Sequence, residues 1–293
     1  MKKALQSLYL RTMRLLPRAL RLRVDYLRRT GRWPSVRQPR LYTEKLLWRS
    51  LHDDAAELRP TCDKAWGKDL ARRLLATEML AVQVPDTYWF GSAADLVDAA
   101  QDVPTPWVAK PNHLGGGIVL VADDPASPRA LEDLVRRSAN AEADFQAFAG
   151  RLWQEARPAF LVEERVGETG AVLTDYKVHV FAGVPRLVSV YSGRFSSLAD
   201  DHYWLDGPDG PPAELRALVS ERSLDTLIGA AATIARPYDY MRVDFYCHDD
   251  VVYFSELTPY PSFAEADKSR SLDERLGRYW STPAPSPRGR NQP

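Results

Sequence analysis

An arginine and two acidic residues that could act together lie near the end of the chain, in RVDFYCHDDVVYFSELT (242–258). Strand alternation places Arg242 and Asp244 on one face of a hairpin. A three-residue turn at 248–250 would set Arg242 opposite Glu256, with Asp244 as its diagonal neighbour, whereas a two-residue turn would put Asp244 and Glu256 on opposite faces. Paired carboxylates suit Mg²⁺ bound together with substrate phosphates. The alternative is a structural ion pair of Arg242 with one acid, leaving the other acid solvated.

A second chemical feature is the stretch WVAKPNHLGGGIVLVAD (107–123), in which Lys110 precedes three glycines. Glycine backbone approaches ligands closely and accepts positive φ, so that its N–H groups can converge on phosphate oxygens. A P-loop places the lysine after the glycines, and both a P-loop and a Rossmann fingerprint lead into a helix. Here a strand follows. The stretch therefore predicts a phosphate-binding flap between two antiparallel strands, with a plain hairpin turn as the alternative.

The sequence argues against several other kinds of site. Its histidines, at positions 52, 113, 179, 202 and 248, are too far apart to indicate a zinc site. No GxSxG motif occurs. Cys62 and Cys247 make no disulfide framework, and we expect free thiols in a reducing cytoplasm. The formal net charge of zero argues against a dedicated nucleic-acid-binding protein.

Two kinds of element must position these residues. Helical periodicity predicts helices at 41–60 (capped by Thr43), 62–80, 92–103 (capped by Ser92), 127–148 and 213–235. Apolar runs between turn signals predict strands at 82–91, 107–110, 118–123, 159–166, 175–183, 184–195 and a hairpin at 240–261. Because the strands form hairpins rather than strict βαβ units, we expect an α+β fold with antiparallel sheets.

The N-terminal segment is strongly basic. Residues 1–32 carry ten Lys or Arg and one acid, Asp25, so the remainder of the chain has a net charge of −9. Arginines interrupt its apolar runs, so the segment is not a signal peptide, and no stretch is long enough to span a membrane. Leucines at near-helical spacing predict a basic amphipathic helix, and contact with an anionic membrane through residues 1–30 is one interpretation of it. The alternative is a solvated helix docked on the protein's own acidic body.

The motifs occur in the order found in ATP-grasp ligases. They are CDK (62–64), VAKPNHLGGG (108–117), LVEERV (161–166), DYKVHVFAG (175–183) and RVDF…FSELTPYP (242–261). Together with YTEKLLWRSLHD (42–53) they resemble the teichuronopeptide-biosynthesis-like (TupA-like) ATP-grasp family over roughly residues 40–262. The resemblance implies an ATP-grasp fold, with two sheet subdomains closing on the nucleotide and a helical N-terminal region.

The resemblance also implies a role for each residue of the nucleotide site. Lys64 and Lys110 would hold the α- and β-phosphates. Glu163, Glu164 and Val166 would form the hinge that holds the adenine. The flap over the triphosphate would be formed by Asn112, His113, Gly115, Gly116 and Gly117.

Other residues would act on the metal and the substrates. Lys177 would lie near the nucleotide or the acceptor, and Arg242 and Lys110 would act in catalysis, Arg242 by stabilising the transferring phosphoryl group. Mg²⁺ would be bound by Asp244, Glu256 and Thr258, although most ATP-grasp enzymes have Asn where Thr258 stands. The substrate side would be lined by Arg194 and His202.

The expected domains follow from the same resemblance. They are a basic N-terminal helix and linker (1–40), a helical pre-grasp region (41–105), a nucleotide-flap subdomain (106–165), a metal-binding subdomain (166–275) and a disordered tail (276–293). After Pro261 the sequence diverges from the family's continuation.

The resemblance implies an ATP- and Mg²⁺-dependent carboxylate–amine ligase that acts through an acylphosphate, in cell-surface polymer or peptide natural-product biosynthesis. Its partners would be small-molecule, glycan or peptide substrates, with no nucleic acid, and it would be cytoplasmic or peripheral at the inner membrane face. Two alternatives remain. One is an ATP-grasp kinase acting on a hydroxyl, and the other is a nucleotide-binding scaffold without turnover.

Overall fold

The computed structural model describes residues 9, 12–13, 15–52, 55–114, 117–121, 127–148, 157–168, 173–193, 199–261 and 269–282, with only the backbone described for 142–148. The chain divides into two compact units. The first takes in Met1–Ala55, Gln146–Arg151 and Tyr260–Pro293, and the second takes in Ala56–Phe145 and Leu152–Pro259.

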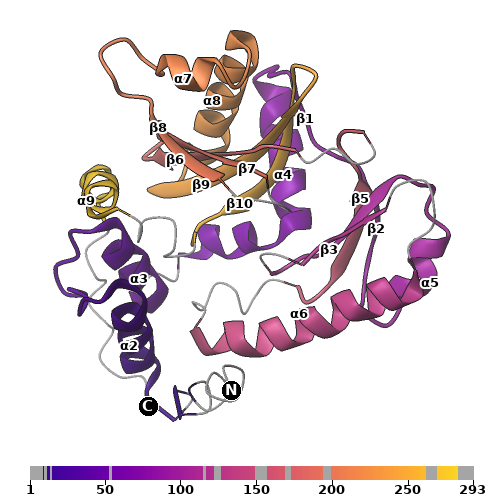
Figure 1. Cartoon of the computed structure of the whole chain (residues 1–293), viewed down its shortest axis with the longest axis horizontal. Coiled ribbons are helices and arrows are strands. Elements are labelled where there is room, and N and C mark those ends of the chain that lie inside the picture. Colours follow the sequence, from indigo (N-terminus) through magenta and orange to yellow (C-terminus); the bar gives the residue numbers. More distant parts are fainter. Residues whose placement is uncertain are drawn as a thin grey trace. The chain divides into compact units, whose positions relative to one another are not determined.

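The second unit contains a six-stranded sheet in the order β1-β10-β9-β6-β7-β8, antiparallel except where β1 pairs with β10 (Figure 1). Its strands are β1 (Val82–Gln83), β6 (Asp175–Phe181), β7 (Val184–Ser192), β8 (Ala199–Trp204), β9 (Tyr240–His248) and β10 (Val251–Thr258). Alternation along β9 gives one apolar face with Met241, Val243 and Phe245, which are fully buried. Helices α4 (Lys64–Thr77) and α8 (Glu221–Ala235) contact these strands. The opposite face carries the charged residues of β9.

A four-stranded antiparallel sheet in the same unit has the order β2-β5-β3-β4. Its strands are β2 (Thr87–Gly91), β3 (Trp107–Pro111), β4 (Val119–Val121) and β5 (Phe160–Glu164), and helices α5 (Leu96–Gln101) and α6 (Pro128–Phe148) belong to the same region (Figure 1). Trp107, Ala109 and Val162 pack against Leu131 and Leu134 of α6. The alternate residues of β3 and β5 therefore point away from α6, and they include Lys110 and Glu163.

The β9–β10 hairpin closes with a two-residue turn. Asp249 and Asp250 have φ of 48° and 60°, and His248 pairs with Val251. Successive positive φ values suit the right-handed twist of a hairpin, and Asp tolerates them better than most residues. The expected three-residue turn at 248–250 is therefore wrong.

A β-bulge in β10 nevertheless places Asp244 and Glu256 on the same face of the hairpin, as the predicted three-residue turn would have done. The register of β10 shifts between Phe254 and Glu256, so Ser255 is an extra residue in that strand. As a result Glu256 lies directly opposite Asp244, and Thr258 rather than Glu256 lies opposite Arg242. A two-residue turn alone would have put the two carboxylates on opposite faces.

The first unit is built from helices α2 (Arg18–Thr30), α3 (Tyr42–His52) and α9 (Arg270–Tyr279). The Asp273 carboxylate accepts hydrogen bonds from the Thr43 backbone N–H at 2.8 Å and from its hydroxyl at 2.9 Å. The buried guanidinium of Arg49 lies 4.5 Å from the Trp280 ring centroid. Thr43 is thus a buried contact between α3 and α9, and not the helix cap that we expected.

Most predicted elements are confirmed, but several boundaries differ. The helix expected at 41–60 ends at His52 and is followed by a 3-10 helix, η1 (Ala56–Cys62). The helix expected at 213–235 is split into α7 (Ala213–Arg216) and α8. Ser92 does not cap α5, because its hydroxyl donates to the Asp95 carboxylate instead. Strand β8 was not predicted, and α9 extends into the tail expected from residue 276.

The α+β class with antiparallel sheets is confirmed. Among the described residues, no helix combines the length and the apolar character that a membrane span needs.

Candidate active site

A buried carboxylate at the end of β5 holds two lysines from different elements. Glu163 Oε1 lies 2.6 Å from Lys110 Nζ on β3, and Oε2 lies 2.7 Å from Lys68 Nζ on α4. Burial raises the pKa of Glu163, but the two ammonium groups outweigh it and leave this pKa below its ordinary value. Burial lowers the pKa of Lys68 in spite of Glu163, whereas Glu163 outweighs burial at Lys110 and raises its pKa. Glu163 is therefore charged and fixes the position of Lys110.

Lys64 is held at the first turn of α4. The helix is capped by Asp63, whose carboxylate accepts a hydrogen bond from the Trp66 N–H at 2.9 Å. Lys64 Nζ donates to the Leu114 carbonyl at 2.6 Å and lies 3.5 Å from Glu256 Oε2 on β10. Burial lowers the pKa of Lys64, and Glu256 offsets only part of that effect. The Asn112 carbonyl lies 3.5 Å from the same nitrogen. An ammonium group held only by carbonyls and one distant carboxylate is well placed to accept a further anion.

Asp244 is held by two cations. The Arg242 guanidinium donates to both of its carboxylate oxygens at 2.7 Å, and Lys177 Nζ lies 3.1 Å from Oδ2. Burial raises the pKa of Asp244, but Arg242 and Lys177 outweigh it and lower this pKa below its ordinary value. Thr258 Oγ1 accepts a further bond from Arg242 at 3.2 Å. Burial and Asp244 raise the pKa of Glu256, but Lys64, Lys177 and Arg242 together outweigh them and lower this pKa, so both carboxylates are charged.

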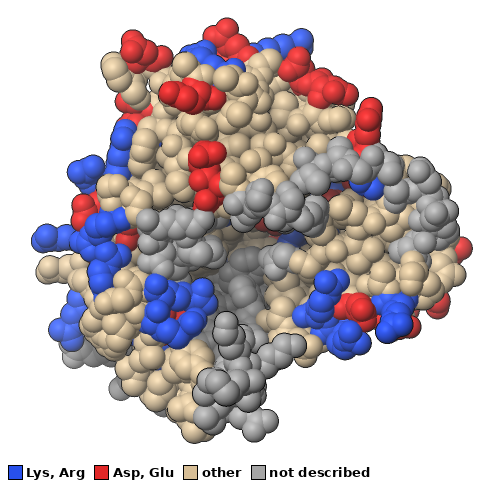
Figure 2. All heavy atoms as spheres, viewed as in Figure 1, with Lys and Arg blue, Asp and Glu red and all other residues tan. Residues whose placement is uncertain are grey.

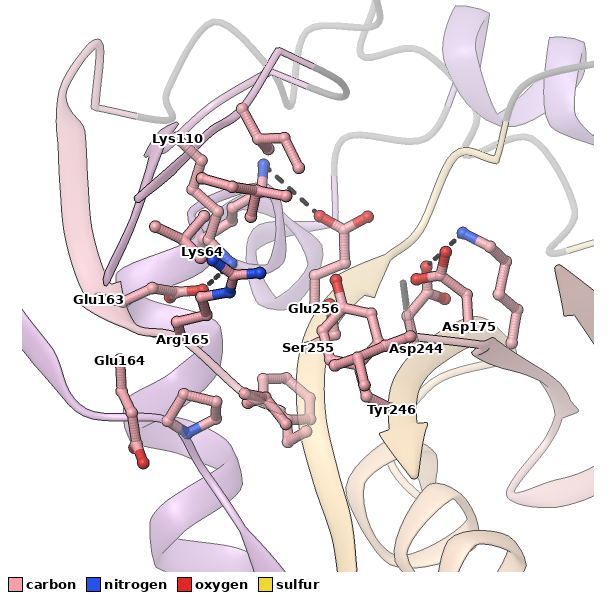
Figure 3. Close-up of a pocket in the computed structure, with 18 of the residues that line it drawn as sticks. Lys64, Lys110, Glu163, Glu164, Arg165, Asp175, Asp244, Tyr246, Ser255 and Glu256 are labelled. Atoms are coloured by element: carbon pink, nitrogen blue, oxygen red, sulfur yellow. Dashed lines mark hydrogen bonds and ion pairs between the residues drawn. The ribbon is translucent and has the colours of Figure 1, made fainter. Parts of the chain in front are cut away.

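These groups line one cleft between the two sheets of the second unit, which we call the inter-sheet cleft. Figure 3 shows Lys64, Lys110 and Glu163 on one side of it and Asp244 and Glu256 on the other. The Lys64–Glu256 ion pair crosses the space between them. Arg242 and Thr258 lie behind Asp244 and do not line the cleft.

The same cleft has an apolar lining. Val108 of β3, Leu120 of β4 and Phe254 of β10 face it, together with Ile118 and Leu173. A space with both apolar walls and buried charges accommodates a ligand that has a flat apolar part and an anionic part.

The predicted hinge residues have different surroundings. Val166 and Glu164 both line the cleft. The Glu164 N–H donates to the Asp86 carbonyl at 2.8 Å, and its carboxylate accepts from the Asp86 N–H at 3.1 Å. The Glu164 side chain thus holds the chain that enters β2, and Glu163 holds the lysines.

The predicted flap is only partly described. Asn112 is buried, and its side chain accepts from the Ala65 N–H at 3.0 Å and donates to the Arg157 carbonyl at 3.1 Å, so it holds the base of the loop. His113 is buried beside it, and Gly117 has a φ of 69°, which favours glycine. Gly115, Gly116 and Arg194 lie outside the described residues.

His202 lies at one end of a hydrogen-bonded chain across the six-stranded sheet. Its Nδ1 is 2.9 Å from Ser189 Oγ, which is 3.3 Å from His179 Nε2, and His179 Nδ1 is 3.1 Å from the Tyr240 hydroxyl. His179 pairs with Arg242 in the β6–β9 register, so the chain shares the charged face. Burial, reinforced by Arg242, lowers the pKa of His179 well below its ordinary value. His202 itself does not line the inter-sheet cleft.

The donor set suits Mg²⁺ bound together with phosphates. Within the described residues no group of three or more His, Cys, Asp or Glu side chains could hold a metal alone. Asp244 and Glu256 nevertheless lie opposite each other on neighbouring strands and are both charged. Mg²⁺ is commonly held by one or two carboxylates, with substrate oxygens and water completing its shell.

Sequence reasoning missed two members of the charged group. Lys68 lies one helical turn beyond Lys64, so the two lysines share a face of α4. Asp175, which is buried and lines the cleft, begins the strand that carries Lys177. Helical spacing could have revealed Lys68, and strand alternation could have placed Asp175 beside Lys177.

A family model described as TupA-like ATP-grasp matches residues 44–281. The chain belongs to the TupA-like ATP-grasp family. The match includes both sheets and every residue of the inter-sheet cleft. The family and the ATP-grasp fold implied by the motifs are therefore confirmed. No curated protein matches this TupA-like chain.

Solved structures similar to the TupA-like chain include a ligase, a macrocyclase and a carboxylase. A D-alanine–D-alanine ligase from Bacillus anthracis is 17% identical, with a TM-score of 0.39, over 75% of this chain and 66% of that one. The macrocyclase MdnC from Microcystis aeruginosa MRC is 12% identical (TM-score 0.42; 77% and 61%). A biotin carboxylase from Campylobacter jejuni is 16% identical (TM-score 0.45; 77% and 48%). The chain thus spans from about half to just under two thirds of their lengths.

Proposed function

We propose that this TupA-like ATP-grasp protein is an ATP- and Mg²⁺-dependent ligase that joins a carboxylate to an amine through an acylphosphate. The observation that supports it most strongly is the convergence of Lys64 and Lys110 with Asp244 and Glu256 around the inter-sheet cleft. These residues come from the middle and from the end of the chain, and a triphosphate with Mg²⁺ needs both sets of charges.

In this proposal ATP replaces ion pairs that already exist. The adenine lies against the apolar lining, and the phosphates contact Lys64 and Lys110. Lys64 then turns from Glu256, 3.5 Å away, to a phosphate, and Glu256 becomes available to the metal. The buried charges therefore have partners both before and after binding, which avoids the cost of a buried unpaired ion.

The proposed chemistry needs positioning and charge neutralisation more than covalent help from the protein. One oxygen of the substrate carboxylate attacks the γ-phosphorus of ATP, and ADP leaves. The amine then attacks the acyl carbon, inorganic phosphate leaves, and the nitrogen loses its proton as the amide forms. Mg²⁺ would neutralise phosphate charge while held by Asp244 and Glu256. Arg242 orients Asp244 and adds positive charge behind it.

The biological setting is proposed from the family and from the substrate chemistry. An enzyme that consumes ATP would work in the cytoplasm, on precursors of a cell-surface polymer or of a peptide natural product. Its carboxylate and amine would be small molecules or the ends of a glycan or peptide, with no nucleic acid involved.

A coupled measurement of ADP release tests the proposal. The protein is incubated with ATP, Mg²⁺ and pools of amino acids and sugar acids, with and without hydroxylamine. We expect ADP release that requires a carboxylate, together with a hydroxamate when hydroxylamine traps the acylphosphate. A stable phosphorylated alcohol without hydroxamate would instead indicate a kinase. ATP binding with no ADP release in any pool would indicate a scaffold, and either result would contradict the ligase.

A further inference from the structure

Helix α2 has two apolar stripes, although packing explains only one of them. Leu22 and Tyr26 are buried, and they pack with Val36, Leu47 and Trp48 in the core of the first unit. This stripe is the one that an amphipathic helix needs in order to dock on its own domain.

The second stripe faces solvent. Leu20, Val24 and Leu27 recur at the spacing of one helix face, and Leu20 and Leu27 are each 39% exposed. Leu15, just before the helix, is 84% exposed, and Trp33, just after it, is 54% exposed. Single exposed apolar residues are ordinary, but a set along one face of a helix, with further exposed apolar residues at both of its ends, is typical of a contact surface.

Arginines border this second stripe on both sides. At 3.6 residues per turn, Arg23 lies along one border and Arg21 and Arg28 lie along the other. Arg21 and Arg23 are half-buried. Within the described part of the chain they pair with no carboxylate, and their Nε atoms are buried without a hydrogen-bond partner. In the range 15–41 the single acid, Asp25, is already held by Arg28 and Arg29. Figure 2 shows Lys and Arg atoms gathered over the region of α2 and α3.

We propose that this surface, which we call the α2 surface (Leu15, Leu20, Arg21, Arg23, Val24, Leu27 and Trp33), binds the face of an anionic lipid bilayer. Helices that lie in a membrane interface bury an apolar stripe among the acyl chains while flanking arginines contact the headgroups. A tryptophan at the end of such a helix suits the headgroup level. A nucleic acid would satisfy the arginines but leave the leucine stripe in water, so the paired pattern favours lipid.

The test is vesicle co-sedimentation of the full chain. The vesicles are made of equal parts phosphatidylglycerol and phosphatidylcholine, or of phosphatidylcholine alone. We expect binding to the anionic vesicles, weaker binding at high salt, and little binding to the neutral ones. Leu20→Gln/Leu27→Gln should weaken binding by about tenfold or more. Arg21→Gln/Arg23→Gln should weaken it by about fivefold for each arginine.

Matched controls come from the second unit. Leu218 is 48% exposed, and Leu218→Gln should leave vesicle binding unchanged. Arg73 and Arg222 are exposed as well, and Arg73→Gln/Arg222→Gln should do the same. Circular dichroism and thermal unfolding check that each variant is folded.

Three results would overturn the proposal. They are no binding of the full chain to anionic vesicles, binding that the α2 variants retain in full, and equal loss in the control variants. The chain is also tested on a DNA oligonucleotide. Tight binding that falls with the arginine variant but not with the leucine variant would assign the surface to nucleic acid instead.

Discussion

The inter-sheet cleft and the α2 surface are both rich in cations, but they hold them in opposite ways. In the cleft Lys64, Lys110 and Lys177 are largely buried, and each lies within 3.5 Å of a carboxylate. On the α2 surface Arg21 and Arg23 border exposed leucines, and no carboxylate among the described residues faces them. One region has buried, paired charges in a defined geometry, and the other has half-buried charges without an ion-pair partner among the described residues.

This difference indicates different kinds of anionic ligand. Buried charges must be paired at all times, so a ligand can enter the cleft only by exchanging partners with the charges already there. Such exchange selects for the shape and spacing of the ligand. The half-buried arginines of the α2 surface have no carboxylate partner among the described residues, and their attraction to a nearby negative surface depends strongly on salt. We therefore expect substitutions in the cleft to have large and specific effects, and substitutions on α2 to leave the cleft unaffected.

The largest effect is expected for Glu256→Gln. The substitution keeps the size of the side chain but removes one of the two carboxylates proposed to hold Mg²⁺, along with the counter-ion of Lys64. The rate of ADP release at saturating Mg²⁺ should fall by about 10²–10³-fold, comparable to the loss of a main electrostatic contact in other enzymes. The far-UV spectrum should be unchanged.

Glu132→Gln is the matched control, because Glu132 is exposed on α6 and should have no effect on ADP release. A Glu256→Gln variant with the wild-type rate and the wild-type Mg²⁺ dependence would remove the proposed metal role.

The next largest effect is expected for Lys68→Met, and it appears in stability. Glu163 then has Lys110 as its remaining cationic partner, and its buried Oε2 loses the counter-ion that Lys68 provided. The free energy of unfolding should fall by about 2–3 kcal/mol, as measured by urea titration. The KM for ATP should also rise, because Lys110 is drawn more strongly to Glu163.

Arg73→Met, on the exposed side of the same helix, serves as the control, and Lys68→Arg should recover part of the lost stability. Equal stability of Lys68→Met and Arg73→Met would show that the pairing of Glu163 with Lys68 contributes nothing.

The sequence predicts the members of the charged group better than it predicts their geometry. Lys110, Asp244 and Glu256 stand in an ordered series of motifs, and local alternation assigns each to a strand. The shared face of Asp244 and Glu256, however, depends on the bulge at Ser255. A bulge changes the register by one residue without a clear signal in composition, so strand alternation alone could not find it.

Residues whose role depends on partners far away in the chain were the hardest to predict. In the sequence Lys68 is one of several basic residues on an amphipathic helix. Its role is evident only in the structure, where β5 brings Glu163 next to it. Thr43 reads as a helix cap until Asp273 in α9 binds it. Strand β8 has the sequence ADDHYW and lacks the apolar run that marked the other strands, and it lies at the edge of its sheet.

A smaller effect, visible only as pH falls, is expected for His179. Its pKa in the folded state is lowered by burial and by Arg242, with Lys177 and His202 acting in the same direction and Asp244 opposing them. Below pH 6.5, the ordinary pKa of a histidine, His179 therefore binds a proton in the unfolded chain but not in the folded protein. The contribution of His179 to the free energy of unfolding is present above that pH. It is lost as the pH falls, by up to about 1.4 kcal/mol per pH unit.

His179→Gln should flatten this slope in urea titrations between about pH 6.5 and pH 5.5. His248→Gln, at the β9–β10 turn, should not flatten it. A slope that is identical in wild type and in His179→Gln would show that His179 takes up its proton equally in the folded and unfolded states.

The smallest effect on ADP release is expected for a variant of the α2 surface, which compares the two regions directly. Arg21→Gln/Arg23→Gln removes charges that flank exposed leucines and that hold no part of the cleft, so the KM for ATP and the rate of ADP release in solution should change by less than about twofold, as for most surface substitutions. The same variant should lose binding to anionic vesicles. If ADP release fell along with vesicle binding even in the absence of lipid, the two sets of cations would act together, and the separation of a specific cleft from a diffuse docking surface would be wrong.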